Sequence, residues 1–287
     1  MRKGCIAGIV TYNPEMDRLK SNILSIVKQA DKVIVIDNDS LNKSEIIRLL
    51  KDINNESIRF ISNDANMGIA YAMNQIGDAA VEERSDFFMT LDQDSIADED
   101  MLDKMLLLFD DPKVGGVAPD LNLSPVSKSN NIEVVQGAIS SGFVVRTELW
   151  KEIGGFWDFL FIDEVDYEFS FQIRRKGYKI LRRHDVSINH IIGESFEKIV
   201  FHHKFHPTNH SAFRRYYIAR NNIIMEYLYP ETDELYAHRE IMLMRTIISI
   251  IICEEDKLER IHAIIKGIRD GKKWCSQNDC ILERRIR

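Results

Sequence analysis

The sequence predicts an α/β protein, with a mostly parallel sheet flanked by helices and a C-terminal helical extension. Between residues 5 and 111, short β-branched runs alternate with segments of helical periodicity, which is typical of strands joined by crossover helices. After residue 210 the pattern is helical throughout. The 287 residues, 45% of them hydrophobic, suffice for a substantial core. We place one domain at residues 1–210 and the extension at 211–287.

The individual elements follow from hydrophobic periodicity and from glycine and proline punctuation. The strands expected in the first half lie at 5–12, 32–39, 58–63 and 86–94. The helices that follow them lie at 14–30, where Pro14 suits the first turn, and at 43–53, 68–83 and 98–111. Less regular strands are expected at 114–123, 132–146 and 178–191, with helices at 147–156 and 163–177. The extension holds helices at 210–229 and, beyond Pro230, at 233–271.

Composition excludes several classes of protein. The net charge of −7 argues against general nucleic-acid binding, which needs a basic surface. The four cysteines form no CxxC pair, so we expect a reducing, cytoplasmic compartment without a disulfide framework or a zinc knuckle. The most apolar late segment, 241–253, is too short to span a bilayer and contains Arg245. No G-x-G-x-x-G or P-loop motif follows the first strand, so phosphate groups need another partner.

Polar residues end each of the first four expected strands. In open parallel sheets ligands bind beyond the carboxyl ends of the strands, near the point where strand order reverses. These ends therefore form the candidate binding site. They are Thr11-Tyr12-Asn13, Asp37-Asn38-Asp39-Ser40, Asn63 to Gly68, and Asp92-Gln93-Asp94.

The motif D-x-D occurs at 37–39, 92–94 and 98–100, so the motif alone is weak. The third copy begins a helix, where aspartate complements the helix dipole without a ligand. The first follows the second strand, where an acidic residue typically binds ribose hydroxyls. Only Asp92 and Asp94 follow the fourth strand, which we expect beside the first strand. Mg²⁺ and Mn²⁺ prefer carboxylate and phosphate oxygens, so this pair predicts a metal site in preference to a plain acidic turn.

A second group of acids lies among aromatic residues in the stretch 154–180. Carboxylates beside apolar walls suit general-base chemistry, because desolvation raises their pKa. A capped, solvated helix start is the alternative interpretation. The acids of this group are Asp163, Glu164, Asp166 and Glu168.

These segments, in this order, resemble the inverting family 2 glycosyltransferases of GT-A fold, and are most similar to bacterial rhamnosyltransferases that use dTDP-L-rhamnose. The segments that carry the resemblance are "VTYNP", "VIDNDS", "NDANMGIAYAMNQI", "LDQDS", "SSGFVVR", "GGFWDFLFIDEVDYEFSFQIRRKGYKI" and "RRYYIARN". Together they span roughly residues 4 to 225.

The resemblance implies a role for each matching position. The implied nucleotide-binding residues are Thr11, Tyr12, Asn13, Asp37, Asn38, Asp39, Asn66, Gly68, Asp92, Arg220 and Asn221. Asp92, Asp94 and His190 match metal positions for Mg²⁺ or Mn²⁺, and Ser141, Gly142 and Trp157 match the acceptor side. The catalytic base is implied among Asp163, Glu164 and Asp166. The family pattern there is Glu-Asp and this chain has Asp-Glu, so we favour Asp163 and then Glu164, with Asp166 in support.

The resemblance implies transfer of a sugar from a nucleotide donor to a glycan or lipid-linked acceptor in surface polysaccharide biosynthesis, with inversion at the anomeric carbon. The rival interpretations are a UDP-sugar donor such as galactofuranose or a hexose, a nucleotidyltransferase, and an inactive nucleotide-binding protein. The C-terminal helices have two interpretations: packing on the core or in a homodimer, or peripheral contact of the apolar face 247–252, with Lys257, Arg260 and Lys266, at the inner membrane face.

Overall fold

The structure is a computed structural model that describes residues 4–121, 131–189, 198–200, 203–205, 208–232 and 239–278. The chain forms two compact units. The first comprises Met1–Phe161 and Val165–His190, and the second comprises Ile162–Glu164 and Ile191–Arg287. The domain division that we predict after residue 210 stays a prediction.

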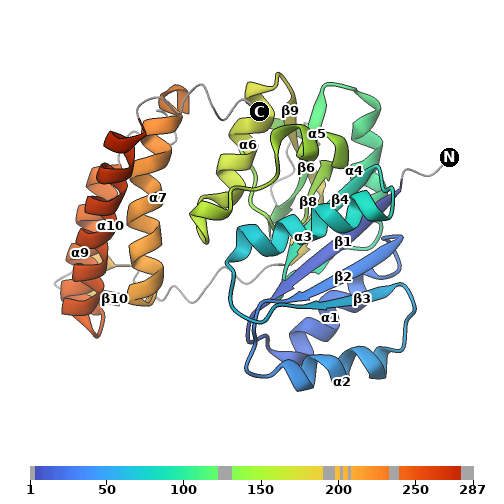
Figure 1. Cartoon of the computed structure of the whole chain (residues 1–287), viewed down its shortest axis with the longest axis horizontal. Coiled ribbons are helices and arrows are strands. Elements are labelled where there is room, and N and C mark those ends of the chain that lie inside the picture. Colours follow the sequence, from blue (N-terminus) through green and yellow to red (C-terminus); the bar gives the residue numbers. More distant parts are fainter. Residues whose placement is uncertain are drawn as a thin grey trace. The chain divides into compact units, whose positions relative to one another are not determined.

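A mixed sheet forms the centre of the first unit, in the order β3-β2-β1-β4-β8-β6-β9-β5, with β7 paired to β9 (Figure 1). Its strands are β1 (Cys5–Thr11), β2 (Lys32–Asp37), β3 (Ile58–Ser62), β4 (Phe87–Asp92), β5 (Ile96–Ala97), β6 (Val114–Leu121), β7 (Ile132–Val135), β8 (Phe143–Arg146) and β9 (Lys179–Asn189). The pairs β1–β2, β2–β3, β1–β4 and β6–β9 are parallel, whereas β8, β7 and β5 pair antiparallel with their neighbours. The mostly parallel α/β sheet predicted from the sequence is therefore confirmed.

Helices cover both faces of this sheet. They are α1 (Met16–Ile26), α2 (Lys43–Ile53), α3 (Ile69–Glu82), α4 (Met101–Leu107), α5 (Thr147–Ile153) and α6 (Val165–Arg175), with 3₁₀ turns η1 (Leu108–Asp110) and η2 (Asp158–Leu160). On one face α1, α2 and α4 bury an apolar cluster against β1, β2 and β4. On the other face α3 approaches β1 so closely that a Cβ at Gly8 would overlap the Ile76 side chain.

The strand order reverses beside β1. The chain runs outward from β1 to β2 and β3, and then returns to place β4 on the opposite side of β1 (Figure 1). Thr11 pairs with Asp37 and Val10 with Asp92, so the ends of the three strands lie at one edge. This is the arrangement that creates a binding crevice in open α/β sheets, and the expected position of β4 is confirmed.

Two local expectations are wrong. The segment 132–146 is not one strand, because residues 136–142 leave the sheet between β7 and β8 and Gly142 turns the chain with φ 79°. Pro14 precedes the N-cap of α1, since Glu15 is the cap and accepts hydrogen bonds from the backbone N–H groups of Asp17 and Arg18. The third D-x-D motif directly precedes α4, as expected, and the Asp98 carboxylate also accepts hydrogen bonds from Ser187 N and Oγ (2.8 and 2.7 Å).

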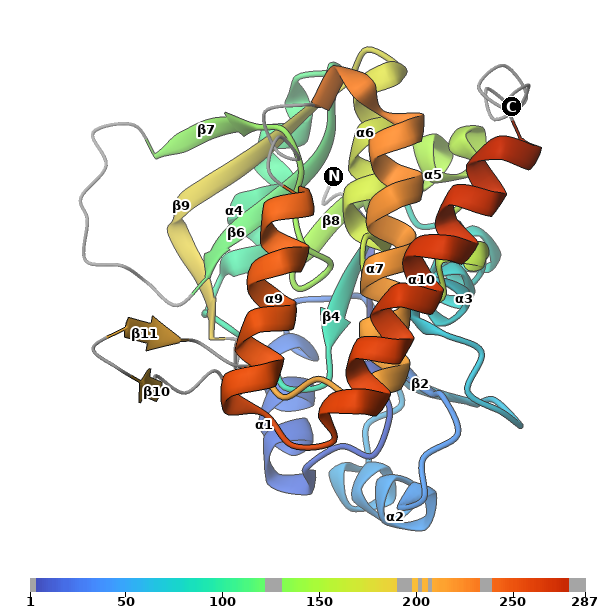
Figure 2. The same ribbon diagram turned by 90° about the vertical axis from the view of Figure 1, so that its left-hand side faces the viewer.

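The second unit is mainly helical in its described part. It contains α7 (Ala212–Leu228), η3 (Pro230–Thr232), α9 (Arg239–Cys253), α10 (Lys257–Gln277) and the antiparallel pair β10 (Lys198–Val200) and β11 (His203–Phe205). The three helices run side by side (Figure 2). Ala219, Ile250 and Ile264, one from each helix, are buried in a shared apolar cluster.

Helix α9 is only partly covered within this unit. Ile247 and Ile250 face the shared cluster, whereas Ile248 and Ile251 are exposed, so the apolar segment presents two faces. No helix in the described part of the chain is long and apolar enough to cross a membrane. Homodimer packing and peripheral membrane contact both stay predictions.

Candidate functional site

The ends of β1 and β2 are tied together by buried polar contacts. Asp37 is fully buried, and its carboxylate accepts a hydrogen bond from the Ser40 N–H (3.2 and 3.3 Å to its two oxygens) and lies 3.8 Å from Lys43 Nζ. Thr11, also fully buried, donates its hydroxyl to the Ile36 carbonyl (3.1 Å). Asn13 takes a positive φ of 50° and bridges the loops, since its N–H donates to Ser40 Oγ (2.8 Å) and its Oδ1 accepts from Leu41 N (2.7 Å). The two loops are therefore held rigid relative to each other.

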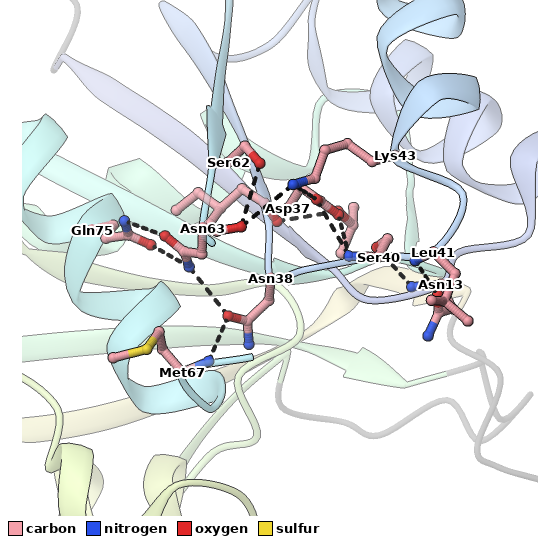
Figure 3. A network of polar contacts seen from close by, with 12 residues as sticks. Asn13, Asp37, Asn38, Ser40, Leu41, Lys43, Ser62, Asn63, Met67 and Gln75 are labelled. Atoms are coloured by element: carbon pink, nitrogen blue, oxygen red, sulfur yellow. Dashed lines mark hydrogen bonds and ion pairs between the residues drawn. The ribbon is translucent and has the colours of Figure 1, made fainter. Parts of the chain in front are cut away.

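A ladder of amide side chains continues this network to β3 and α3 (Figure 3). Asn38 Oδ1 accepts hydrogen bonds from Asn63 Nδ2 (3.1 Å) and from Met67 N (3.0 Å), and Asn63 exchanges two bonds with Gln75 (3.1 and 2.9 Å). Asn38 Nδ2 in turn donates to Asn66 Oδ1 (3.0 Å). Asn38 thus fixes the loop that leads into α3.

Gly68 is required where that loop enters α3. Its φ is 87°, and a Cβ there would overlap the backbone and ring of Phe161. The Ile69 N–H donates to the Phe161 carbonyl (2.7 Å), so the chain after η2 lies directly against the start of α3. Asp39, exposed and with φ 71°, is the one acid of the 37–39 pair that faces solvent in the described structure.

The second D-x-D motif forms a tight turn at the end of β4. Ser95 N donates to the Asp92 carbonyl (3.2 Å), which closes the turn. The middle residue, Gln93, accepts a hydrogen bond from the Tyr12 N–H through Oε1 (2.7 Å), which joins the turn to the end of β1. The motif therefore belongs to the same strand-end site as Thr11 and Asn13.

The donor set of this turn fits a hard divalent cation. Asp92 and Asp94 are both partly exposed, and Mg²⁺ sites commonly use one or two carboxylates, with water and substrate phosphate completing the shell. Among the described residues no group of three or more His, Cys, Asp or Glu is arranged around one point. His190, the third predicted metal ligand, lies outside the described residues.

Ser140, which sequence reasoning missed, connects the turn to helix α6. Its hydroxyl donates to Asp92 Oδ1 (3.3 Å), and its backbone N–H donates to Asp166 Oδ2 (3.1 Å). Its carbonyl accepts from Thr90 Oγ1 (2.6 Å), which fixes the loop on β4. Ser140 therefore connects Asp166, a predicted catalytic acid, to Asp92 of the predicted metal turn through two hydrogen bonds.

The three predicted acceptor residues lie in different surroundings. Ser141 is buried, and its hydroxyl is hydrogen-bonded to that of Ser95, so it faces the protein interior. Gly142 turns the chain into β8, and its N–H donates to the Thr90 carbonyl (2.8 Å). Trp157 stacks on the exposed ring of Phe159, with ring centroids 5.1 Å apart.

In the second unit, the predicted base Asp163 is held by an arginine that sequence reasoning also missed. Arg214 Nη2 donates to Asp163 Oδ1 (2.8 Å), and Arg214 Nε lies 3.3 and 3.2 Å from the two carboxylate oxygens. Asp163 and Glu164 both take positive φ values, 62° and 66°. The buried Asn221 supports this strained backbone, since its Nδ2 donates to the carbonyls of Ile162 (2.8 Å) and Asp163 (3.0 Å).

Arg220, a predicted nucleotide ligand, is mostly buried in the second unit. Its Nε and Nη2 donate to Asn221 Oδ1 (2.9 and 2.7 Å), and its guanidinium lies over the Tyr217 ring, 4.7 Å from the centroid. Burial lowers the pKa of the Arg220 guanidinium from its ordinary value. Arg220 thereby fixes the Asn221 amide that holds the 162–164 segment.

His210 near the start of α7 provides a pH-dependent test of this unit. Burial, assisted by the charges of Arg214 and Arg215, lowers the pKa of His210 from 6.5 to about 4. Between these two values the unfolded chain binds a proton that the folded chain does not, so the free energy of unfolding is expected to fall as the pH falls from 6.5 to 4. Urea denaturation across this range, with His210→Gln, measures the effect.

The His210→Gln variant should lose part of this pH dependence, because glutamine takes up no proton. The exposed His262→Gln on α10 is the matched control and should retain it. An identical pH profile for wild type and His210→Gln would contradict the prediction.

Sequence reasoning also missed a polar row on α1. The row follows helical spacing and consists of Arg18, Asn22 and Ser25, with Gln29 in the turn after the helix. Each of these side chains is hydrogen-bonded to a backbone group in the segment 92–102. The available signal was a line of polar residues beside the buried Leu19, Ile23 and Ile26.

Comparison with known proteins places this site in a family context. The family model described as "Glycosyl transferase family 2" matches residues 7–177, more than half of the chain. A curated relative, the dTDP-rhamnosyl transferase RfbF of Shigella flexneri, is 28% identical over 293 residues, which cover 94% of this chain and 96% of the relative.

Solved structures share the fold. The mannosyltransferase PcManGT from Pyrobaculum calidifontis, in complex with GDP-Man and Mn²⁺, superposes with a TM-score of 0.62 at 15% identity, covering 100% of this chain and 85% of that one. TarS of S. aureus in complex with UDP-GlcNAc superposes with a TM-score of 0.61 at 16% identity, covering 98% and 87%. The GT-A fold expected from the sequence is thereby confirmed.

Proposed function

Because this chain belongs to glycosyl transferase family 2 and is a glycosyltransferase, we propose that it transfers L-rhamnose from dTDP-L-rhamnose to a glycan or lipid-linked acceptor of a bacterial surface polysaccharide. The observation that carries the donor assignment is the similarity to the dTDP-rhamnosyl transferase RfbF, which extends over nearly the full length of both chains. The solved relatives, at 15 and 16% identity, support the fold alone.

The proposed donor site lies at the ends of β1, β2 and β4. The nucleoside would contact the exposed Tyr12, Asn13 and Asp39. The fully buried Thr11 and Asp37 would hold these loops in place, and this rigidity lowers the entropic cost of binding. The diphosphate would lie at the turn that carries Asp92 and Asp94. Asp92 and Asp94 would hold a Mg²⁺ or Mn²⁺ ion, which would supply positive charge to offset the negative charge of the diphosphate. The Mn²⁺ and the sugar nucleotide in the mannosyltransferase complex show that a protein of this fold can bind both, which agrees with the proposal.

The proposed reaction is a single displacement. A carboxylate, Asp163 in our assignment, takes the proton from an acceptor hydroxyl while that oxygen forms a bond to the anomeric carbon. The bond from the anomeric carbon to the diphosphate oxygen breaks on the opposite face, and its electron pair leaves with dTDP. Attack opposite the leaving group inverts the anomeric configuration, as in inverting glycosidases. Glu164 is the second candidate for the base.

Nucleotide-dependent thermal stabilisation tests the donor assignment. We expect dTDP with Mn²⁺ to raise Tm more than UDP, GDP or NAD at equal concentration. A ligand at one hundred times its Kd adds about 2.7 kcal/mol to the free energy of unfolding, which is a readable shift. Turnover of dTDP-L-rhamnose would then be measured by release of dTDP in the presence of acceptor.

The alternatives give different outcomes. Preferential stabilisation by UDP would overturn the rhamnose assignment and favour a UDP-sugar donor within the same family. Stabilisation by no nucleotide, with or without Mn²⁺, would contradict a nucleotide-sugar site at these strand ends.

A further inference from the structure

The backbone of the D-x-D turn is held from one side by helix α1. Arg18 Nε donates to the Asp94 carbonyl (2.6 Å), and Asn22 Nδ2 donates to the Asp92 carbonyl (2.7 Å). Arg18 and Asn22, about one turn apart on the same face of α1, therefore bond the main chain of both aspartates. Both bonds are made to main-chain oxygens, whereas the Asp92 carboxylate accepts a hydrogen bond from Ser140 Oγ (3.3 Å).

Arg18 also reaches the end of β9. Its Nη2 donates to the Asn189 carbonyl (2.8 Å) and to Asn189 Oδ1 (2.6 Å). One partly buried guanidinium thus spans the D-x-D turn and the end of the strand that contributes Asn189. The planar fork of arginine makes three such bonds in fixed directions, and lysine, whose donors all lie on one nitrogen, cannot reproduce them.

Asn22 is placed at a cost in stability. Its side chain is fully buried, yet its Oδ1 has no hydrogen-bond partner among the described residues. A buried acceptor without a partner is unfavourable, and an apolar residue of similar size would avoid this. The hydrogen bond from Asn22 Nδ2 to the Asp92 carbonyl is therefore the contribution that an apolar residue at this position could not make.

The same row continues along the segment after the turn. Ser25 Oγ accepts from Ala97 N (3.0 Å), while Gln29 donates to the Asp98 carbonyl (2.9 Å) and accepts from Leu102 N (3.0 Å). The segment 92–102 is thus bonded along its length to α1 and to the turn that follows this helix. Such support fixes a binding turn before its ligand arrives.

We infer that Arg18, assisted by Asn22, is a positioning residue that sets the affinity of the Asp92–Asp94 turn for its divalent cation. It would act by fixing the main chain of Asp94, while Asn22 fixes that of Asp92, and would thereby set the positions from which the two carboxylate side chains project. This inference rests on the proposed function only in that the turn binds a metal. Outer residues that orient metal ligands typically change metal affinity by about 10- to 100-fold when replaced.

The test measures Mn²⁺ affinity directly, by calorimetry in the presence of saturating dTDP or UDP, on the full chain. Arg18→Met keeps the length of the side chain and removes all its donors, and we expect Mn²⁺ to bind at least about tenfold more weakly. Arg18→Lys should recover part of the loss. Lys20→Ala, an exposed position on the same helix, is the matched control and should bind Mn²⁺ like the wild type.

A second readout separates positioning from a general loss of structure. In Arg18→Met the Mn²⁺ concentration for half-maximal activity should rise about tenfold, while kcat at saturating Mn²⁺ and Tm without metal should change little. Asn22→Ala should weaken Mn²⁺ binding in the same direction. Unchanged Mn²⁺ affinity in Arg18→Met, with wild type binding normally, would overturn the inference and leave the proposed function intact. Absence of Mn²⁺ binding in the wild type would overturn the metal site itself, and the inference with it.

Discussion

Replacing Asp94 by asparagine is expected to lower kcat/KM by about a thousandfold, which corresponds to about 4 kcal/mol of transition-state stabilisation. Asparagine keeps the shape of the side chain but removes the charge that a hard cation prefers, so charge on the departing diphosphate is no longer offset. The Mn²⁺-dependent part of the thermal stabilisation by dTDP should disappear with it. Steady-state kinetics and thermal denaturation on the same preparations measure both effects.

The control for this variant is Asp100→Asn. Asp100 belongs to the third D-x-D motif, is exposed, makes no side-chain capping bond to α4, and has a φ of 57° that asparagine tolerates. Asp100→Asn should behave like the wild type in both assays. If Asp94→Asn retained metal-dependent stabilisation, the turn at the end of β4 would not be the metal site.

The second large effect is expected at Asp163. Asp163→Asn should lower kcat by about 10²- to 10⁴-fold, the usual contribution of a general base, because the amide cannot take the proton of the acceptor hydroxyl. Stabilisation by nucleotide and Mn²⁺ should persist, since the donor site does not depend on this proton transfer. Kinetics at saturating donor and acceptor separate the loss of kcat from changes in KM.

The ion pair with Arg214 needs its own control, because Asp163→Asn also weakens that contact. Arg214→Gln removes the same ion pair and leaves the carboxylate in place, so it should retain far more activity than Asp163→Asn. Equal losses in the two variants would assign Asp163 a structural role. A large loss in Glu164→Gln, with Asp163→Asn active, would transfer the role of the base to Glu164.

Sequence patterns predicted the elements whose structure depends on local periodicity. Helix α2 has the predicted bounds 43–53, because apolar residues recur on one face and Asn54 closes the helix in the left-handed region. The rule that ligands bind where strand order reverses selected Asp92, because we expected the strand that it ends to lie beside β1. These predictions needed no knowledge of contacts between distant residues.

Interactions between distant residues escaped prediction. Arg18 and Asn189 are far apart in sequence. Any residue type has a main-chain carbonyl that can accept a bond from a guanidinium, so the sequence does not indicate which residue accepts it. Ser140 was hidden inside a segment that looked like a single strand, because its neighbours are β-branched or small. Arg214 resembled any charged residue on a helix, and only the fold of the second unit brings it to Asp163.

Helix α1 has a consequence for the order of events in folding. One of its faces buries Leu19, Ile23 and Ile26 in the core, and the adjacent face bonds the turn after β4, 70 to 76 residues later in the chain. Such non-local contacts form late, because the entropy of closing a long loop must be offset first. In a newly synthesised chain, Asp92 and Asp94 would therefore be present before the contacts that position them for metal binding had formed. Binding of the cation would therefore follow folding. A cation that binds only the native state would then raise the free energy of unfolding.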